Sequence, residues 1–150
     1  MSTDAQSVGF MVHSVWRLLR RLADGRLKPL GLSSAHMPVI GALMNGEELS
    51  QKALAEAAAV EQPSMAELLA RMERDGLICR RRDPADKRGS LARLSPELIE
   101  KLPEIRVVIE SINRDALAGL GEAGAKAFYA IMSGLVGSLE QALKVPDRSE

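Results

Sequence analysis

The stretch that decides the fold is SQKALAEAAAVEQPSMAELLARMERDGLICRRRDPADKRGSLARLS, residues 50–95. Its apolar spacing and its breakers predict two short helices followed by two short strands, at residues 51–58, 63–75, 77–81 and 90–94. Ser50 is suited to capping the first helix, and Pro63 to the first turn of the second. The strands are joined by a polar turn at residues 83–89. The stretch therefore predicts two small helices and a hairpin.

The hairpin concentrates positive charge in a chain that has none overall. The chain has 20 basic and 20 acidic residues, so its formal net charge is zero. Residues 80–93 contain six basic and two acidic residues, a local charge of +4, whereas residues 95–150 have a charge of −3. Because contact with phosphates depends on where charge is placed, the hairpin is a candidate nucleic-acid contact. A solvated loop that serves solubility is the less favoured alternative.

Outside this stretch the chain is predicted to be helical. Apolar residues recur at spacings of three and four in further segments, at residues 8–30, between Ser33 and Gly46, at 96–120 and at 122–143. Pro103 is expected to bend or break the helix that contains it. The outer helices have more apolar surface than one thin layer can bury, so we expect packing against a second copy of the chain. A monomeric helical bundle is the alternative.

Composition limits the class of protein. Apolar residues make up 46% of the 150 residues, charged residues 27% and aromatic residues 3%, which predicts one helical globular domain. The single cysteine, Cys79, excludes an internal disulfide and fits a reducing compartment. The most apolar late segment, residues 127–139, is shorter than the roughly 20 residues of a membrane span. With no secretory signal in the first ten residues, we expect a cytoplasmic protein without a membrane segment.

This arrangement resembles the MarR family of bacterial transcription regulators. The resemblance is carried by LSQKALA at residues 49–55, VEQPSM at 60–65, LARMERDGLI at 69–78, RDPADKR at 82–88 and LS at 94–95. The most specific of these is the Asp-x-x-Asp-Lys-Arg pattern of residues 83–88 after a Gly-Leu-Ile strand. The Glu-Gln-Pro-Ser sequence of residues 61–64 is most similar to the SlyA-like branch. The resemblance extends from residue 8 to about residue 143.

The resemblance implies a mainly α fold with a small β-hairpin wing. One domain, residues 1–150, would hold a winged helix-turn-helix head at residues 33–95 between dimerisation helices at 8–32 and 96–144. It also implies a homodimer that binds pseudo-palindromic promoter DNA, and we expect this protein to repress rather than to activate transcription. A small aromatic or phenolic ligand would be able to release that DNA.

By the resemblance, residues 63–75 form the recognition helix. Its N-terminal end would meet base edges in the major groove, and the candidates for base contacts are Gln62, Pro63, Ser64 and Glu67. Arg71, one turn further along, is predicted to hold a phosphate. Helix capping by Gln62 or Ser64 is the alternative role. Glu61 and Glu67 make this helix less basic than is usual, so affinity is expected to depend more heavily on the wing.

The wing tip, residues 83–89, is predicted to contact the minor groove or the backbone through Arg88. Asp86 is expected to hold the guanidinium of Arg88 in place. Arg81, Arg82 and Lys87 are predicted to bind phosphates, since arginine and lysine supply most backbone contacts to DNA.

A ligand pocket is a second hypothesis. Its candidate residues combine basic side chains for a carboxylate with an aromatic or apolar wall: Trp16, Arg17, Arg20, His36 and Met37. The alternative, slightly favoured, is an ordinary dimer core with a solvated arginine face, because helical spacing already explains Trp16 and Met37.

Catalysis finds little support in the sequence. The two histidines, His13 and His36, have no cysteine or carboxylate spacing typical of zinc, and no glycine-rich phosphate loop follows a strand. We therefore expect a protein that is not an enzyme and has no metal or cofactor. Cys79 is expected to pack as a small apolar residue rather than to sense peroxide. The rival function is a winged-helix module whose basic hairpin docks an acidic protein partner.

Overall fold

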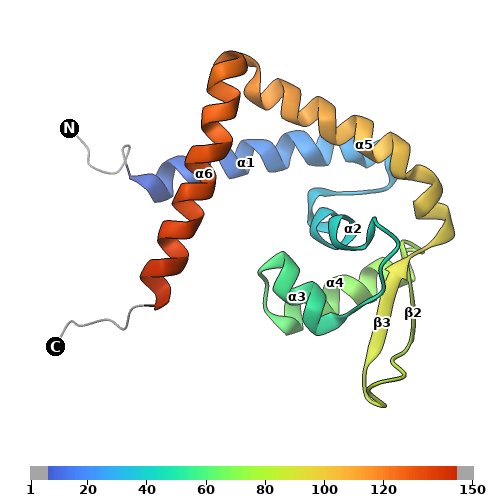
Figure 1. The fold of residues 1–150 in the computed structure, drawn as a ribbon. Helices are drawn as coiled ribbons and strands as arrows, with labels where there is room; N and C mark the ends of the chain where they lie inside the picture. Colours follow the sequence, from blue (N-terminus) through green and yellow to red (C-terminus); the bar gives the residue numbers. More distant parts are fainter. Residues whose placement is uncertain (1–6, 145–150) are drawn as a thin grey trace. The chain divides into compact units, whose positions relative to one another are not determined.

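The computed structural model describes residues 7–144, which form a mainly helical fold with one small sheet (Figure 1). The α-helices are α1 (Val8–Leu27), α2 (Met37–Leu43), α3 (Gln51–Ala58), α4 (Gln62–Arg74), α5 (Pro96–Leu117) and α6 (Gly121–Lys144). The short 3₁₀ turns are η2 (Lys28–Leu30), η3 (Ser34–His36) and η4 (Ala118–Leu120). The strands are β1 (Leu49–Ser50), β2 (Ile78–Arg82) and β3 (Ser90–Leu94). The predicted fold class is confirmed.

In the part of the chain that the structure describes, serine side chains cap three of the α-helices: Ser7 caps α1, Ser50 caps α3 as the sequence predicts, and Ser95 caps α5. Ser50 Oγ accepts a hydrogen bond from the N–H of Ala53 at 3.2 Å, at the start of α3. Ser95 Oγ, buried, accepts from the N–H of Leu98 at 3.1 Å, in the first turn of α5. Each cap satisfies a backbone donor that the helix itself leaves unpaired, so these boundaries are encoded locally.

The ends of two predicted helices change: the helix predicted for residues 96–120 ends at Leu117, and η4 follows it. The first helix ends at Leu27 rather than at Leu30, because Pro29 lies in the separate turn η2 and Gly31 follows with a φ of 73°. In α5 the helix continues through Pro103, so the proline does not break it.

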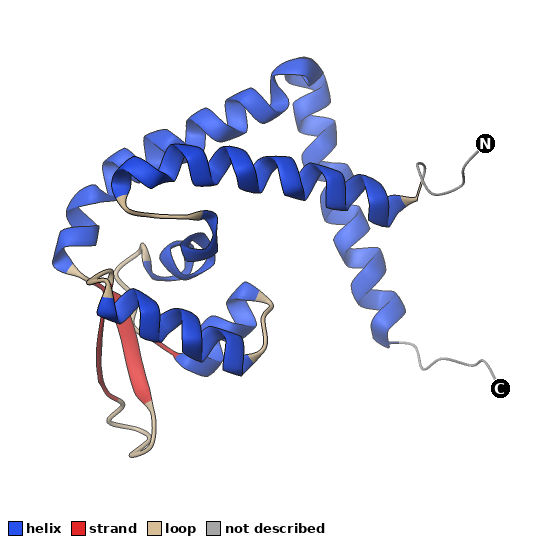
Figure 2. Cartoon of the chain, turned by 180° about the vertical axis from the view of Figure 1, so that it is seen from behind, coloured by secondary structure: helices blue, strands red, loops and turns tan. Residues whose placement is uncertain are grey.

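The sheet is antiparallel with the order β1-β3-β2. Strands β2 and β3 form a hairpin, here called the wing, which extends beyond α3 and α4 in both views (Figures 1 and 2). One face of the sheet is closed by buried Ile78, Ala92 and Leu94. The strand β1 was not predicted, because two residues are too short to show an alternating pattern.

The core gathers apolar side chains from every helix before residue 112. Its most deeply buried members are Leu27, Val39, Ile40, Leu43, Leu54, Met65, Leu69, Met72, Leu98 and Ile105. The predicted burial of Leu54 and Ala55 in α3 is confirmed. Arg26 Nη1 also donates to Ser111 Oγ at 3.0 Å, which joins α1 to α5.

The chain divides into two compact units between Ile112 and Asn113. The first contains the core, the sheet and the helices from α1 to most of α5. The second contains η4 and α6, and none of the 24 residues of α6 is buried. In residues 7–144, no helix is long and apolar enough to cross a membrane.

Candidate nucleic-acid interface

The helix α4 is amphipathic, with one face in the core and one in solvent. Met65, Leu69 and Met72 are buried at spacings of four and three, as the helical period requires. The predicted contact residues all lie on the exposed side of the helix: Gln62, Pro63, Ser64, Glu67 and Arg71. No side chain caps α4, so the polar groups of Gln62 and Ser64 are not used for capping.

The turn between α3 and α4 sets the angle at which α4 is presented. Ala59 ends α3 with a φ of 52°, and among residues 7–144 it is the one non-glycine residue with a positive φ. Its N–H still bonds to the carbonyls of Ala55 and Glu56. Left-handed backbone at an alanine is strained, and surrounding packing must hold it there.

The wing tip is shaped by two aspartates. Asp83 Oδ1 accepts from the N–H of Ala85 at 2.8 Å, and Asp86 Oδ1 accepts from the N–H of Arg88 at 2.9 Å. The Gly89 N–H donates to the carbonyl of Asp86 at 3.0 Å, which closes the turn. The expectation that Asp86 holds the guanidinium of Arg88 is wrong: in the described part of the chain, Asp86 bonds to the Arg88 backbone instead. A short carboxylate binds a nearby backbone N–H more readily than a mobile guanidinium.

The exposed end of α4 and the wing tip line a common cavity. Its volume is about 360 Å³, and its lining comes from β1, α3, α4 and the wing: Ser50, Gln51, Lys52, Gln62, Asp83, Asp86, Arg88, Gly89 and Ser90. Gln62 is thereby brought together with Asp86 and Arg88. Gln51 Nε2 donates to the carbonyl of Gln62 at 3.4 Å, which ties the starts of α3 and α4 together.

Sequence reasoning missed the contribution of α3 to this cavity. Gln51 and Lys52 fall in its first turn, directly after the Ser50 cap. An exposed lysine at the start of a helix beside the predicted recognition helix was the available signal.

Two arginines of the wing are already paired. Arg80 Nε donates to Glu73 Oε2 at 3.0 Å, and Arg81 Nε donates to Glu48 Oε2 at 2.7 Å. The Arg81 guanidinium lowers the pKa of Glu48, and Glu48 raises the pKa of Arg81. Arg81, predicted to bind phosphate, therefore has a carboxylate partner within the protein although its side chain is 53% exposed, and Arg82, Lys87 and Arg88 are exposed as well.

The candidate ligand residues fall into two groups. Trp16, Arg17 and Arg20 are exposed on α1, where Arg20 Nε lies 3.8 Å from Asp24 Oδ2. His36 and Met37 are half-buried at the junction of η3 and α2.

His36 completes a capping box with Ser33. The N–H of Ser33 donates to His36 Nδ1 at 3.1 Å. The pKa of His36 is lowered overall, mainly because burial disfavours the charged ring. The carboxylates of Asp75 and Asp24 act in the opposite direction, and the positive charge of Arg71 lowers the pKa further. The neutral ring, which can accept the Ser33 bond, is therefore the favoured form.

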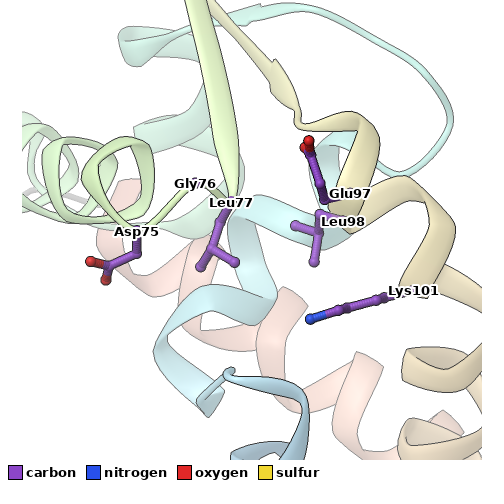
Figure 3. A pocket seen from close by; sticks show the side chains of 6 residues that line it. All are labelled: Asp75, Gly76, Leu77, Glu97, Leu98 and Lys101. Carbon is purple, nitrogen blue, oxygen red and sulfur yellow. The ribbon is translucent and has the colours of Figure 1, made fainter.

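A second cavity, of about 370 Å³, lies at the base of the wing (Figure 3). The residues that line it come from the segment directly after α4 and from the first two turns of α5: Asp75, Gly76, Leu77, Glu97, Leu98 and Lys101. In Figure 3 Leu77 and Leu98 form an apolar wall and the Lys101 side chain extends beside them. Neither cavity includes any of the five candidate ligand residues.

Comparison with known proteins agrees with this geometry. Residues 30–89 match the model described as the MarR family, and these residues include α3, α4 and the wing tip. The match covers 60 of the 150 residues, among them Gln62 and Arg88.

Solved structures share the fold over most of their length. A probable transcriptional regulator from Pseudomonas aeruginosa is 24% identical, with a TM-score of 0.80 over 87% of this chain and 97% of that one. A mutant MarR from E. coli complexed with operator DNA is 17% identical, with a TM-score of 0.82 over 90% and 99%. BpsR from Bordetella bronchiseptica is 20% identical, with a TM-score of 0.81 over 91% and 97%.

Proposed function

We propose that this chain is a sequence-specific DNA-binding transcription regulator that acts as a homodimeric repressor on pseudo-palindromic promoter DNA. The observation that carries the proposal is the shared cavity, in which the exposed start of α4 and the wing tip lie together. A helix for the major groove and a basic hairpin for the adjacent backbone are the two contacts that a winged helix makes with a duplex. The resemblance of residues 61–64 favours the SlyA-like branch of the family, and we infer a cytoplasmic protein.

The polar side chains at the start of α4 are suited to base edges. Gln62 can form a bidentate pair with adenine, Ser64 can bond to a base or a phosphate, and Glu67 can accept from a cytosine amino group. Arg71, further along the exposed side of α4, and Lys52, which lines the cavity with Gln62, are suited to phosphates. On the wing, Arg88 would reach the minor groove or the backbone.

The dimer is proposed because large apolar side chains are exposed on two long helices. On α1 these are Val8, Phe10, Met11, Val12, Val15, Trp16 and Leu18, and on α6 they are Tyr129, Ile131, Val136, Leu139 and Leu143. Large apolar side chains exposed along one helix are typical of an interface. A second copy would cover these faces and hold two heads about 34–36 Å apart, the distance between successive major-groove faces.

Regulation by a small aromatic or phenolic ligand is part of the proposal. The structure of BpsR concerns regulation of its DNA binding by 6-hydroxynicotinic acid. In this chain Arg17 and Arg20 could pair with an anion, with Trp16 and Met37 beside its ring. A ligand that binds more tightly to a head spacing unsuited to DNA would shift the population away from the DNA-bound form.

The test is fluorescence anisotropy with a labelled duplex from the region upstream of the gene. A scrambled duplex, two salt concentrations, Arg88→Ala and a matched control, Arg106→Ala on α5, complete the design. We expect tight, salt-dependent binding to the native duplex, since phosphate contacts release counterions. Arg88→Ala should weaken it about tenfold, in line with about 1–3 kcal/mol for a specific arginine contact, and Arg106→Ala should not.

Weak and equal binding to both duplexes, repeated with other genomic fragments, would count against this function. The exposed carboxylates Glu61 and Glu67 at the start of α4 and the zero net charge would then favour the rival, an acidic protein partner for the wing.

A further inference from the structure

The wing strand β2 is held by ion pairs to two different parts of the first compact unit. Arg80 Nε lies 3.0 Å from Glu73 Oε2, and Glu73 is on α4. Arg81 Nε lies 2.7 Å from Glu48 Oε2, and Glu48 immediately precedes β1. The four residues of these two pairs are here called the wing brace: Glu48, Glu73, Arg80 and Arg81.

The two pairs act on opposite faces of the strand. Successive residues in a strand point to opposite faces, so Arg80 and Arg81 cannot reach the same partner. Arg80 points to the face that α4 covers. Arg81 is paired in register with Leu91 of β3, and β3 separates β2 from β1. The bond from Arg81 to Glu48 therefore spans the central strand and joins both edges of the sheet.

The pairs also place a carboxylate beside two arginines of the wing, which partly offsets their positive charge. Arg81 lowers the pKa of Glu48 first by its hydrogen bond and then by its charge, and Arg93 acts in the same direction. Both members are therefore charged at neutral pH. The exposed cations that extend past the brace towards the tip are Arg82, Lys87 and Arg88.

We propose that Glu48 and Glu73 are positioning residues of the DNA interface, which act through Arg81 and Arg80 to fix the direction of the wing relative to α4. The inference rests on the proposed function. The wing meets β1 through only two register pairs, so its base is held by little other backbone pairing. A small rotation at the base is amplified at Arg88, and misplacement of a contact by a fraction of an ångström is costly.

The test compares Glu48→Gln, Glu73→Gln and the double variant with Glu47→Gln and Glu56→Gln. The two controls remove the same negative charge from exposed positions, one shortly before β1 and one on α3. The probe is a labelled duplex selected from a random pool with the wild-type protein. Each brace variant should bind about threefold more weakly and the double variant about tenfold, from the usual strength of exposed ion pairs. The controls should bind as well as wild type or slightly better.

A charge exchange separates positioning from direct contact with DNA. Glu48→Arg combined with Arg81→Glu restores the ion pair in reverse, so it should recover affinity to within about twofold of wild type, whereas each single exchange should not. If Arg81 binds phosphate itself, the exchange will fail to rescue, and the proposal is overturned. Tighter binding by Glu48→Gln with a steeper salt dependence would also overturn it, because the carboxylate would then be a competitor of phosphate.

Hydrogen–deuterium exchange of the DNA-free protein tests whether the wing brace holds the hairpin, and this test does not depend on the proposed function. Peptides that cover residues 78–94 should exchange faster in the double variant than in the Glu47→Gln control. Unchanged exchange would overturn the brace. Faster exchange in a protein that binds no duplex would support the brace while the proposed function fails.

Discussion

The head and the last helix of this chain use apolar residues in opposite ways. In α4, Met65, Leu69 and Met72 are each at most 1% exposed. In α6, Ile131 is 68% exposed and Leu139 is 54% exposed, and no residue of the helix is buried. Similar helical periodicity thus accompanies a buried apolar face in α4 and a solvent-exposed apolar face in α6. The difference teaches that amphipathic spacing predicts a helix but does not say which molecule covers it.

The largest expected effect tests this difference in burial directly. Leu69→Ala should lower the free energy of unfolding by about 2–5 kcal/mol, because it leaves a cavity in a closed core. Leu139→Ala should change it by no more than about 0.5 kcal/mol in dilute protein. Urea unfolding followed by circular dichroism at two protein concentrations measures both. An equally large loss for Leu139→Ala in dilute protein would mean that α6 is packed within the single chain.

The second prediction concerns what covers α6. Ile131→Glu with Leu139→Glu should weaken self-association at least tenfold, since each buried side chain of this size contributes about 1.5–3 kcal/mol. Sedimentation velocity gives the dissociation constant, and Gln141→Glu on the same helix is the control for added charge. A double variant that sediments like wild type would contradict the proposed use of α6 in a dimer.

The third prediction, with a smaller effect, tests whether the backbone at Ala59, in the turn between α3 and α4, is strained. Ala59→Gly should raise the free energy of unfolding by about 1 kcal/mol, because glycine adopts a positive φ without the steric cost of Cβ. Ala57→Gly, two residues earlier within α3, should lower it by about 0.5–1 kcal/mol. Because the two substitutions are expected to change the free energy of unfolding in opposite directions, thermal unfolding of both variants tests the prediction. A loss of stability in both would show that the turn is not strained.

The smallest effect on stability is expected at His36, whose Nδ1 accepts a hydrogen bond from the N–H of Ser33. The pKa of His36 is lowered on folding from its usual 6.5, so the folded state binds the proton more weakly than the unfolded chain. This contribution to stability is complete above pH 6.5 and is lost as the pH falls through 6.5 towards the folded pKa. His36→Gln should flatten the pH dependence of the unfolding midpoint in this range. His13→Gln on α1 is the control, and an unchanged slope in His36→Gln would rule out the mechanism.

Much of the head was predictable because its signals are local. Ser50 and Ser95 cap the helices that follow them, and the residues between the two strands form the expected turn. The fold class follows from these short-range signals, whereas Gln62 and Arg88 lie beside one cavity because the fold brings α4 and the wing together. The strand β1 and the contribution of Lys52 were missed, since neither has a pattern longer than two residues.

The sequence by itself determined the order of the helices and of the two hairpin strands and most of their starting points, because caps, prolines and apolar periods act within one or two turns of the chain. Tertiary structure alone decided which charged groups meet. Glu48 and Arg81 are 33 residues apart, and only the order of the three strands brings them together. Asp86 likewise turned to a backbone N–H rather than to the side chain expected. Ion pairs depend on distances of a few ångströms between side chains, and such distances exist only once the backbone has been packed.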